Sequence, residues 1–302
     1  MPHTKDWIIA FRLRTLPLAF SSIFMGSFIA AFHHAFRWDI LLLASLTTLF
    51  LQILSNLAND YGDAMSGADH EGRLGPERMV QSGKITPSQM KIMMMVFVVL
   101  SLIAGMGLIY SAFRGVLSLT GGLFFLMGIG AIAAAIKYTV GRNPFGYRGR
   151  GDIYVFLFFG LVGVCGTYFL HTNSWNWEVL LPAVSVGLLS AGVLNVNNIR
   201  DEETDRETGK RTLVVHLGGR IARNYHIVLI GGALVSLVTF VALQKTVIWS
   251  WLFLLALPLL VRHVRVVVCN TDHDVLDPEL KRLAISTLFI VLLTGAGLLL
   301  SI

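Results

Sequence analysis

The sequence predicts an all-α membrane protein, a bundle of about nine transmembrane helices. Of its 302 residues, 55% are hydrophobic and only 14% are charged, whereas roughly a quarter of the residues in a soluble domain carry a charge. Apolar runs recur along the chain at about the 20-residue length that crosses the hydrocarbon core of a bilayer. Because lipid cannot satisfy exposed backbone groups, these runs must be helical.

The first apolar run is a membrane span rather than a signal peptide, since it lacks a small-residue cleavage site and more such runs follow it. Glycine recurs inside runs such as GMGLIYSAF and GLVGVCG, which permits close contact between helices in a bundle. The predicted spans, in order, cover residues 16–36, 40–58, 92–113, 115–138, 153–171, 178–198, 225–243, 247–268 and 283–302.

The distribution of lysine and arginine predicts the orientation of the bundle. With nine spans, the N-terminus and the loops after the even-numbered spans share one side of the membrane. That side carries all of the 24 lysines and arginines except Arg37, Arg114 and Lys245. The positive-inside rule assigns it to the cytosol. We therefore expect a multi-pass cell-membrane protein with a cytosolic N-terminus and its long polar loops in the cytosol.

The second span runs into a polar stretch, SNLANDYGDAMSGADHEGR, that begins at Ser55. On a helix, Asn56, Asp60 and Asp63 of this stretch share one face over two turns. Carboxylate and amide oxygens suit Mg²⁺, which proteins bind through a few carboxylates together with substrate phosphates. For this motif alone, a solvated helix end with polar caps is the plainer alternative.

The sixth span ends in a similar way, in NNIRDEETDRETGKRTL. Asn197, Asp201 and Asp205 are spaced i, i+4 and i+8, again on one helical face. Spans two and six are parallel, so both motifs reach the cytosolic side. Two facing acidic clusters repel each other unless cations lie between them. We therefore expect two Mg²⁺ ions, replaceable by Mn²⁺, and an anionic ligand.

Basic residues accompany both motifs and predict the nature of that ligand. Arginine and lysine clamp phosphate oxygens, although cytosolic loops also need cations for topology alone. Acids and bases on one face indicate metal ions that bridge a polyphosphate, and the apolar bundle behind them indicates that the rest of the ligand is a lipid. The basic residues in question are Arg73, Arg78, Lys137, Arg142, Lys210 and Arg211.

Together, the motifs resemble those of the UbiA superfamily of intramembrane prenyltransferases over nearly the whole chain. NLANDYGDAMSGAD with GPERMVQSG resembles the first aspartate-rich motif, and NNIRDEETDRETGKRTL resembles the second; KYTVGRNPFGYRGRGD and RLRTLPLAFSSIFMGSF also fit. Where the family's first motif ends in aspartate, this chain has Gly67, with Asp69 two residues later. That spacing is similar to the branch that prenylates 1,4-dihydroxy-2-naphthoate. The resemblance implies a single transmembrane prenyltransferase domain over residues 1–302.

The resemblance also implies roles for the residues. Mg²⁺ would be held by Asn56, Asp60, Asp63, Asp201 and Asp205. The four aspartates and Lys137 would be catalytic. The diphosphate of the donor would be bound by Asn56, Arg73, Arg78, Lys137, Asn197, Lys210 and Arg211.

The implied reaction transfers a polyprenyl chain from polyprenyl diphosphate to 1,4-dihydroxy-2-naphthoate, with loss of CO₂ and diphosphate, and gives demethylmenaquinol in menaquinone biosynthesis. Preorganised cations would stabilise the leaving diphosphate. Loss of CO₂ restores the aromatic ring, so no strong base is needed. Tyr138, Tyr147 and Tyr154 can offer ring faces to an allylic cation, although tyrosines at the membrane interface are the commoner case.

Several alternatives remain at this point. 4-Hydroxybenzoate or another phenolic ring is the alternative acceptor. A CDP-alcohol phosphatidyltransferase would carry a D-G-x-x-A-R block, which this sequence lacks. A cation transporter would place its ionisable residues near the middle of the bilayer. Membrane lipid is the expected surrounding, no nucleic-acid partner is expected, and the histidines lack the paired spacing of a zinc site, which favours structural roles.

Overall fold

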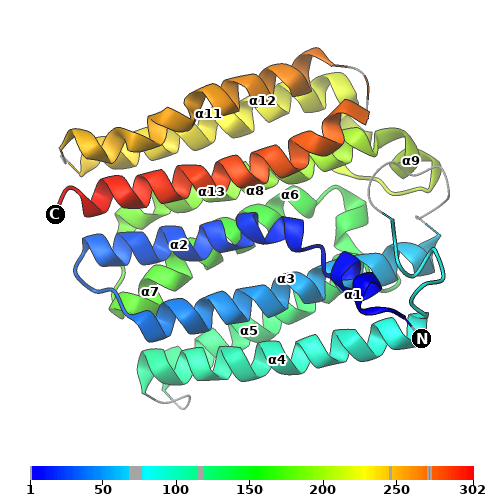
Figure 1. Ribbon diagram of the computed structural model, residues 1–302, viewed down its shortest axis with the longest axis horizontal. Coiled ribbons are helices and arrows are strands. Elements are labelled where there is room, and N and C mark those ends of the chain that lie inside the picture. Colours follow the sequence, from blue (N-terminus) through cyan, green and yellow to red (C-terminus); the bar gives the residue numbers. More distant parts are fainter. Residues whose placement is uncertain (1, 68–76, 115–117, 245–246, 271, 273) are drawn as a thin grey trace.

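The computed structural model describes residues 2–67, 77–114, 118–244, 247–270, 272 and 274–302. All regular secondary structure in these ranges is helical, and they contain nine helices, some with short breaks, that are long and apolar enough to cross a membrane. The predicted class, an all-helical multi-pass membrane bundle, is thus confirmed. The chain termini lie at opposite ends of the bundle (Figure 1), as an odd number of spans requires.

The N-terminal half forms the first four spans. Arg12, in a left-handed conformation with φ 50°, separates the short first helix from the second. Thr86 begins the third long helix by accepting a hydrogen bond from the Gln89 amide, which satisfies a backbone donor that the helix leaves free. The elements are α1 (Thr4–Phe11), η1 (Leu13–Thr15), α2 (Leu16–Phe32), α3 (Trp38–Ser66), α4 (Pro87–Phe113) and α5 (Leu119–Lys137).

The C-terminal half begins with a composite span that contains ten π-helical residues, Phe156–Cys165. A Cβ atom at Gly160 would lie 2.6 Å from the carbonyl oxygen of Ala183, so this glycine lets two helix backbones touch. The elements are η2 (Phe145–Arg148), α6 (Gly151–Val155), η3 (Phe156–Cys165), α7 (Gly166–Thr172), η4 (Trp177–Val179), α8 (Leu180–Arg200), α9 (Glu202–Glu207), α10 (Leu213–Leu217), α11 (Gly219–Leu243), η5 (Ile248–Ala256), α12 (Leu257–Cys269), η6 (Asp274–Leu276) and α13 (Asp277–Leu299).

Two large apolar cores hold the bundle together. One joins α2, α8, α11 and α13 through side chains such as Ile29, Leu189 and Phe240. The other joins α1, α3 and α4 and includes Met79 and Ile85 of the connection between α3 and α4. The first acidic motif lies at the end of α3, in the core that also holds α1 and α4. The second motif follows α8, which belongs to the other core. The space between the two cores is therefore where the motifs can meet.

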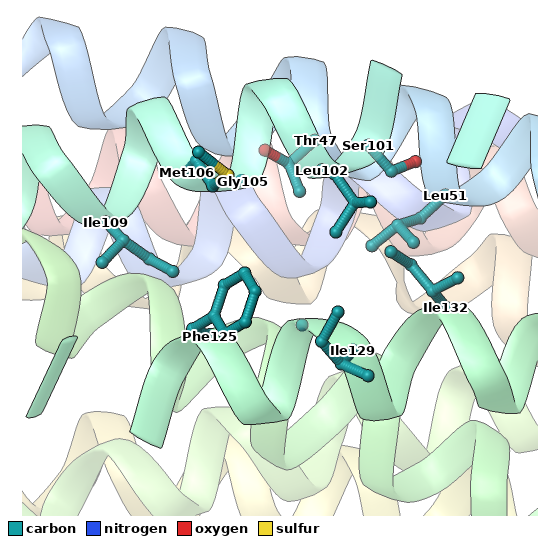
Figure 2. A pocket seen from close by; sticks show the side chains of 11 residues that line it. Thr47, Leu51, Ser101, Leu102, Gly105, Met106, Ile109, Phe125, Ile129 and Ile132 are labelled. Carbon is teal, nitrogen blue, oxygen red and sulfur yellow. The ribbon is translucent and has the colours of Figure 1, made fainter. Parts of the chain in front are cut away.

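Of the described spans, helix α5 packs least against the rest of the bundle, and only 6% of its most apolar stretch is buried inside the protein. A small pocket lies between it and helices α3 and α4 (Figure 2), with Leu51, Phe125 and Ile132 among its lining residues. The hydroxyls of Thr47 and Ser101, which also line it, donate to carbonyl oxygens of their own helices. The pocket is accordingly apolar and offers no chemistry.

A buried polar chain ties the last three helices together. The Nε2 atoms of His226 on α11 and His263 on α12 lie 3.0 Å apart, and Nδ1 of His263 lies 2.7 Å from Glu279 of α13. The structural role predicted for the histidines agrees with this arrangement. Sequence spacing could not indicate the pair, because the two histidines are 37 residues apart.

Candidate active site

Helix α3 continues past its apolar run and carries the first acidic motif on its last three turns. A solvated helix end is the alternative interpretation of this motif from sequence, but Asp60 and Asp63 are only 1% and 3% exposed. Residues 77–86, which precede α4, contact one of these acids through Met79, and η2 reaches the other through Tyr147. Buried carboxylates need partners because an unpaired buried charge is strongly unfavourable.

Asp60 is hydrogen-bonded to backbone amides, and the positive charge of Arg12 also acts on it. Its two carboxylate oxygens accept hydrogen bonds from the amides of Met79 (3.0 Å) and Val80 (3.1 Å). Met79 is fully buried in the core beside α3, so the loop is fixed both by packing and by this carboxylate. Each carboxylate oxygen has a further lone pair and can still bind a cation.

Asp63 is paired with two side chains from different segments. Its Oδ2 accepts a hydrogen bond from the buried Arg78 at 2.6 Å, and its Oδ1 accepts one from the Tyr147 hydroxyl, also at 2.6 Å. Tyr147 lies on η2, and its hydroxyl is also 2.9 Å from Ser66 Oγ. Tyr147 is therefore the one tyrosine of the three considered in the sequence whose hydroxyl reaches the described acids of the site.

Gly62 explains how the segment that carries Tyr147 comes so close to α3. A Cβ atom at this position would lie 2.6 Å from the carbonyl oxygen of Thr139. The Thr139 hydroxyl donates to the carbonyl oxygen of Ala58 at 2.9 Å, so the two segments are also hydrogen-bonded. The glycine between the two aspartates thus positions the chain opposite the motif.

The second motif is interrupted at its first aspartate. Helix α8 ends at Arg200, Asp201 has φ −94° and ψ 9°, and α9 begins at the next residue. The prediction of one continuous helical face is therefore wrong at this point. The four-residue spacing survives, because the Asp201 amide donates to Asn197 (3.0 Å) and the Asp205 amide donates to Asp201 (2.8 Å).

Arg200, which the sequence gave no reason to single out, is buried beside this break. Its Nε and one terminal nitrogen donate to the two oxygens of Asp201 at 2.7 and 2.8 Å. Its other terminal nitrogen donates to Asp277, the first residue of α13, at 2.5 Å. Asn197 also bonds to both Arg200 (3.1 Å) and Asp201 (3.3 Å).

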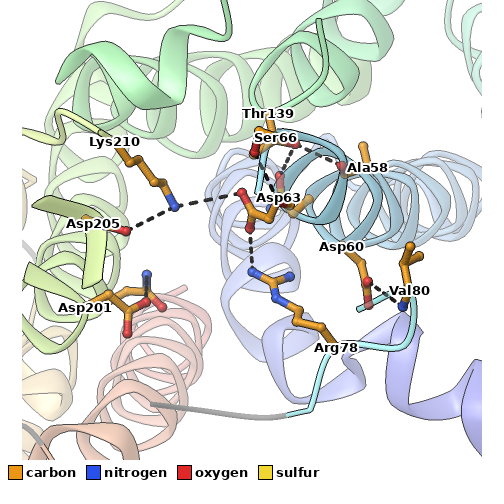
Figure 3. A network of polar contacts seen from close by, with 12 residues as sticks. Ala58, Asp60, Asp63, Ser66, Arg78, Val80, Thr139, Asp201, Asp205 and Lys210 are labelled. Atoms are coloured by element: carbon orange, nitrogen blue, oxygen red, sulfur yellow. Dashed lines mark hydrogen bonds and ion pairs between the residues drawn. The ribbon is translucent and has the colours of Figure 1, made fainter. Parts of the chain in front are cut away.

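The two motifs meet across Lys210 (Figure 3). Its Nζ lies 3.6 Å from Asp205 Oδ1 and 4.0 Å from Asp63 Oδ1. The ammonium also lies 5.2 Å from the centre of the Tyr147 ring. Asp63 and Asp205 are 142 positions apart in the chain. Their shared contact with Lys210 places both in one buried site at the same end of the bundle.

Burial raises the pKa of Asp205 to about 6; Lys210 opposes this shift, and Asp201 and Asp63 add to it. Its Oδ2 is buried and has no hydrogen-bond partner in the described part of the chain. A divalent cation at this oxygen would remove the unfavourable desolvation, so the residues fit Mg²⁺. In that same part of the chain, no three His, Cys, Asp or Glu side chains already form a metal cluster; Arg78, Arg200 and Lys210 neutralise the acids instead.

Asn56 is engaged elsewhere. Its amide nitrogen donates to the Phe11 carbonyl (2.9 Å) and to Thr15 Oγ1 (3.1 Å), while its oxygen lies 3.4 Å from Gln52 Nε2. The asparagine therefore fastens α3 to the N-terminal segment. A carbonyl oxygen has two lone pairs, so a metal-binding role for Asn56 stays a prediction.

The remaining expected residues lie at the edge of the site or outside the described ranges. Lys137, at the end of α5, is exposed and makes no ion pair with a described residue, and the Arg211 side chain is also exposed. The Arg211 amide donates to the Tyr147 carbonyl (3.0 Å), which joins the second motif to η2. Asp69 and Arg73 fall within residues 68–76, outside the described residues.

These features define a class: an all-helical, multi-pass membrane protein with a buried acidic site between two helix ends. Residues 19–276 match the UbiA prenyltransferase family, and the chain belongs to this family. It is 44% identical to the 1,4-dihydroxy-2-naphthoate octaprenyltransferase of Escherichia coli (strain K12), over 99% of this chain and 96% of that protein. The protein of the same name from Mycobacterium tuberculosis (strain ATCC 25618 / H37Rv) is 38% identical over 87% of this chain and 86% of its own length.

Solved structures share the fold. A UbiA homolog from Aeropyrum pernix K1 superposes with a TM-score of 0.66 at 15% identity and covers 99% of each chain. A UbiA homolog from Archaeoglobus fulgidus, bound to DMAPP and Mg²⁺, superposes with a TM-score of 0.55 at 15% identity, over 92% of this chain and 98% of that one. These superpositions, which cover nearly the whole length of each chain, show that the helical fold is shared with these proteins.

Proposed function

We propose that this protein transfers a polyprenyl chain from polyprenyl diphosphate to 1,4-dihydroxy-2-naphthoate, with release of CO₂ and diphosphate, in menaquinone biosynthesis. The near-full-length similarity to naphthoate octaprenyltransferases supports the acceptor and the reaction. The single observation that supports the chemistry best is the meeting of Asp63 and Asp205 across Lys210. Acids from two helices with a partly buried cation between them suit a diphosphate with its metal ions.

Asp60, Asp63, Asp201 and Asp205 would hold two Mg²⁺ ions, which supply Lewis-acid stabilisation of the leaving diphosphate when bound. A UbiA homolog from Archaeoglobus fulgidus binds Mg²⁺ together with DMAPP or GPP, which supports Mg²⁺ and a prenyl diphosphate as the ligands. Arg78 and Lys210, now paired with the acids, would turn to the diphosphate oxygens as the acids turn to metal. Because both cations are already in place, little reorganisation accompanies bond breaking.

The same residues fit an acceptor that loses CO₂. The electron-rich ring attacks the allylic carbon, and departure of the carboxyl group restores aromaticity without a strong base. Tyr147, held at 2.6 Å from Asp63, would keep its ring beside the diphosphate end of the donor, where a π face attracts positive charge. We propose further that residues 1–302 act as one transmembrane domain, with the N-terminus and the site facing the cytosol.

Purified protein with polyprenyl diphosphate, Mg²⁺ and carboxyl-labelled naphthoate tests this function. We expect labelled CO₂ in step with prenylated naphthoquinol, loss of turnover with EDTA, and recovery with Mg²⁺ or Mn²⁺. Little product is expected from 4-hydroxybenzoate. Turnover that survives EDTA treatment and washing contradicts the metal assignment, and a product that keeps its carboxyl label contradicts the acceptor chemistry.

A further inference from the structure

Arg200 and Asp201 are neighbours in sequence, yet they form a two-pronged ion pair. Adjacent residues on a regular helix point in different directions. Helix α8 ends at Arg200 and α9 begins after Asp201, and at this break both oxygens of Asp201 accept hydrogen bonds from the guanidinium at 2.7 and 2.8 Å. The break and the ion pair thus occur together, immediately before α9, which carries Asp205.

The guanidinium of Arg200 is itself fixed from the other edge. Its remaining terminal nitrogen bonds to Asp277 at 2.5 Å, and the arginine has less than 2% of its surface exposed. A guanidinium is planar and rigid, with its five N–H donors in a fixed fork. An acceptor on one edge therefore sets the plane in which the other edge presents its donors to Asp201.

Sharing of the positive charge of Arg200 also favours metal binding at Asp201. Arg200 forms ion pairs with both Asp201 and Asp277, so its positive charge is shared between the two carboxylates rather than directed at Asp201 alone. Without the charge of Asp277, the whole charge of Arg200 would fall on Asp201. Groups that orient and tune a metal-binding carboxylate change metal affinity by about 10- to 100-fold when they are removed.

We infer that Arg200 and Asp277 are positioning residues for Asp201: the chain Asp277–Arg200–Asp201 fixes the rotation and the charge of this carboxylate for metal binding. The inference rests on the proposed function, which requires a divalent cation at Asp201. Asp277 begins α13, so the last span of the bundle is coupled to the second acidic motif. Arg14, 3.7 Å from Asp277, brings the N-terminal segment to the same point.

Asp277→Asn is the decisive variant, because it removes the charge but keeps an oxygen that can accept from Arg200. Asp277 is partly exposed, so the substitution leaves no buried cavity. Asp274→Asn is the matched control: it removes the same charge three residues earlier, from an exposed aspartate that makes no ion pair in the described residues. Arg200→Lys keeps the charge and loses the fork, and serves as a second variant.

Binding of Mn²⁺ to the purified protein, followed by electron paramagnetic resonance without substrate, gives the first readout. We expect Asp277→Asn to raise the Kd for Mn²⁺ about 10-fold, Arg200→Lys to raise it at least as much, and Asp274→Asn to leave it unchanged. The second readout is the Mg²⁺ concentration for half-maximal transfer, which should rise in parallel for Asp277→Asn while kcat at saturating Mg²⁺ stays within about 2-fold.

A purely structural role would lower kcat and the melting temperature of Asp277→Asn without moving its metal titration. If the unaltered protein binds Mn²⁺ and transfers prenyl groups, an equal Kd for Mn²⁺ in Asp277→Asn and Asp274→Asn overturns this inference alone. Absence of both Mn²⁺ binding and prenyl transfer in the unaltered protein overturns the proposed function as well. The two failures are therefore distinguishable.

Discussion

At the scale of single residues, each acid of the site is held by different donors. Asp60 accepts two backbone amides, Asp63 accepts from an arginine and a tyrosine, and Asp205 has a buried oxygen without a described partner. Replacing a carboxylate costs folding energy only where it satisfies a donor that would otherwise be left unpaired. Replacement of the different aspartates should therefore lower stability to different extents, while each replacement lowers activity.

Asp205→Asn should lower prenyl transfer at least about 100-fold and leave the melting temperature within about 2 °C. The substitution removes a buried charge with an unsatisfied oxygen, while Lys210 keeps Asp63 as a partner. Transfer assays at saturating Mg²⁺ and thermal unfolding in detergent measure the two effects. Prenyl transfer at the normal rate by Asp205→Asn would show that Asp205 does not bind the metal.

Asp60→Ala should abolish transfer and also destabilise the protein. The amides of Met79 and Val80 would lose a charged acceptor, at a cost of about 2–4 kcal/mol for two such hydrogen bonds in a buried place. Asp60→Asn, which keeps one acceptor oxygen, is the control and should recover part of the stability but not the activity. Unfolding free energies that are equal for Asp60→Ala and the unaltered protein would contradict the anchoring role.

Tyr147→Phe should lower kcat about 10-fold, the equivalent of about 1.4 kcal/mol, and leave the protein folded. The variant keeps the ring beside Lys210 but loses the hydrogen bond to Asp63. Tyr154→Phe is the matched control, since its ring stacks on Phe145 at 3.9 Å rather than contacting the acids. An equal effect of the two substitutions would show that the Tyr147 hydroxyl has no role in transfer.

At the scale of elements, α3 positions the site because it extends beyond the membrane-spanning run and is covered there by two loops. Gly67, with φ 74°, ends the helix in the left-handed conformation, which glycine adopts readily. Gly62 lets the segment after α5 touch the helix. The helix itself was predictable from the sequence, whereas the loops that cover it were not.

Gly62→Ala tests this covering contact. Its methyl group would lie 2.6 Å from the Thr139 carbonyl oxygen, so the backbone must shift, and overpacking of this kind costs about 1–3 kcal/mol. Gly105→Ala in α4, where the nearest atom would lie at 3.8 Å, is the control and should change stability by less than about 0.5 kcal/mol. We expect transfer to fall about 10-fold or more for Gly62→Ala alone; equal activity of both variants would contradict the covering role.

At the scale of the whole molecule, the bundle brings together motifs that belong to different apolar cores. The first motif lies at the end of α3, and the second lies between α8 and α10. In Figure 1 the end of α3, helix α1 and helix α9 lie at one end of the bundle, and the C-terminus lies at the other. The site consequently faces one side of the membrane, which we propose is the cytosol.

The two cysteines provide a test of this orientation without introducing new residues. Cys269 is exposed at the end of α12, at the same end of the bundle as α9, and Cys165 is buried. A membrane-impermeant maleimide should label the protein in inside-out vesicles and not in right-side-out vesicles, and Cys269→Ser should abolish the labelling. Labelling in right-side-out vesicles only would place the site outside the cell.

The sequence by itself determined the class, the nine spans and the two acidic motifs, because hydrophobic length and four-residue spacing are local properties of the chain. It also predicted which acids and bases to examine, and Asp63, Asp205, Arg78 and Lys210 do lie together. Only the tertiary structure decided that these acids are buried, that Asn56 bonds to the N-terminal segment, and that Tyr147, Arg200 and Asp277 complete the site. Apart from the pair of neighbours Arg200 and Asp201, these contacts join residues that are distant in sequence, and packing of the two cores, rather than any local pattern, brings them within hydrogen-bonding distance.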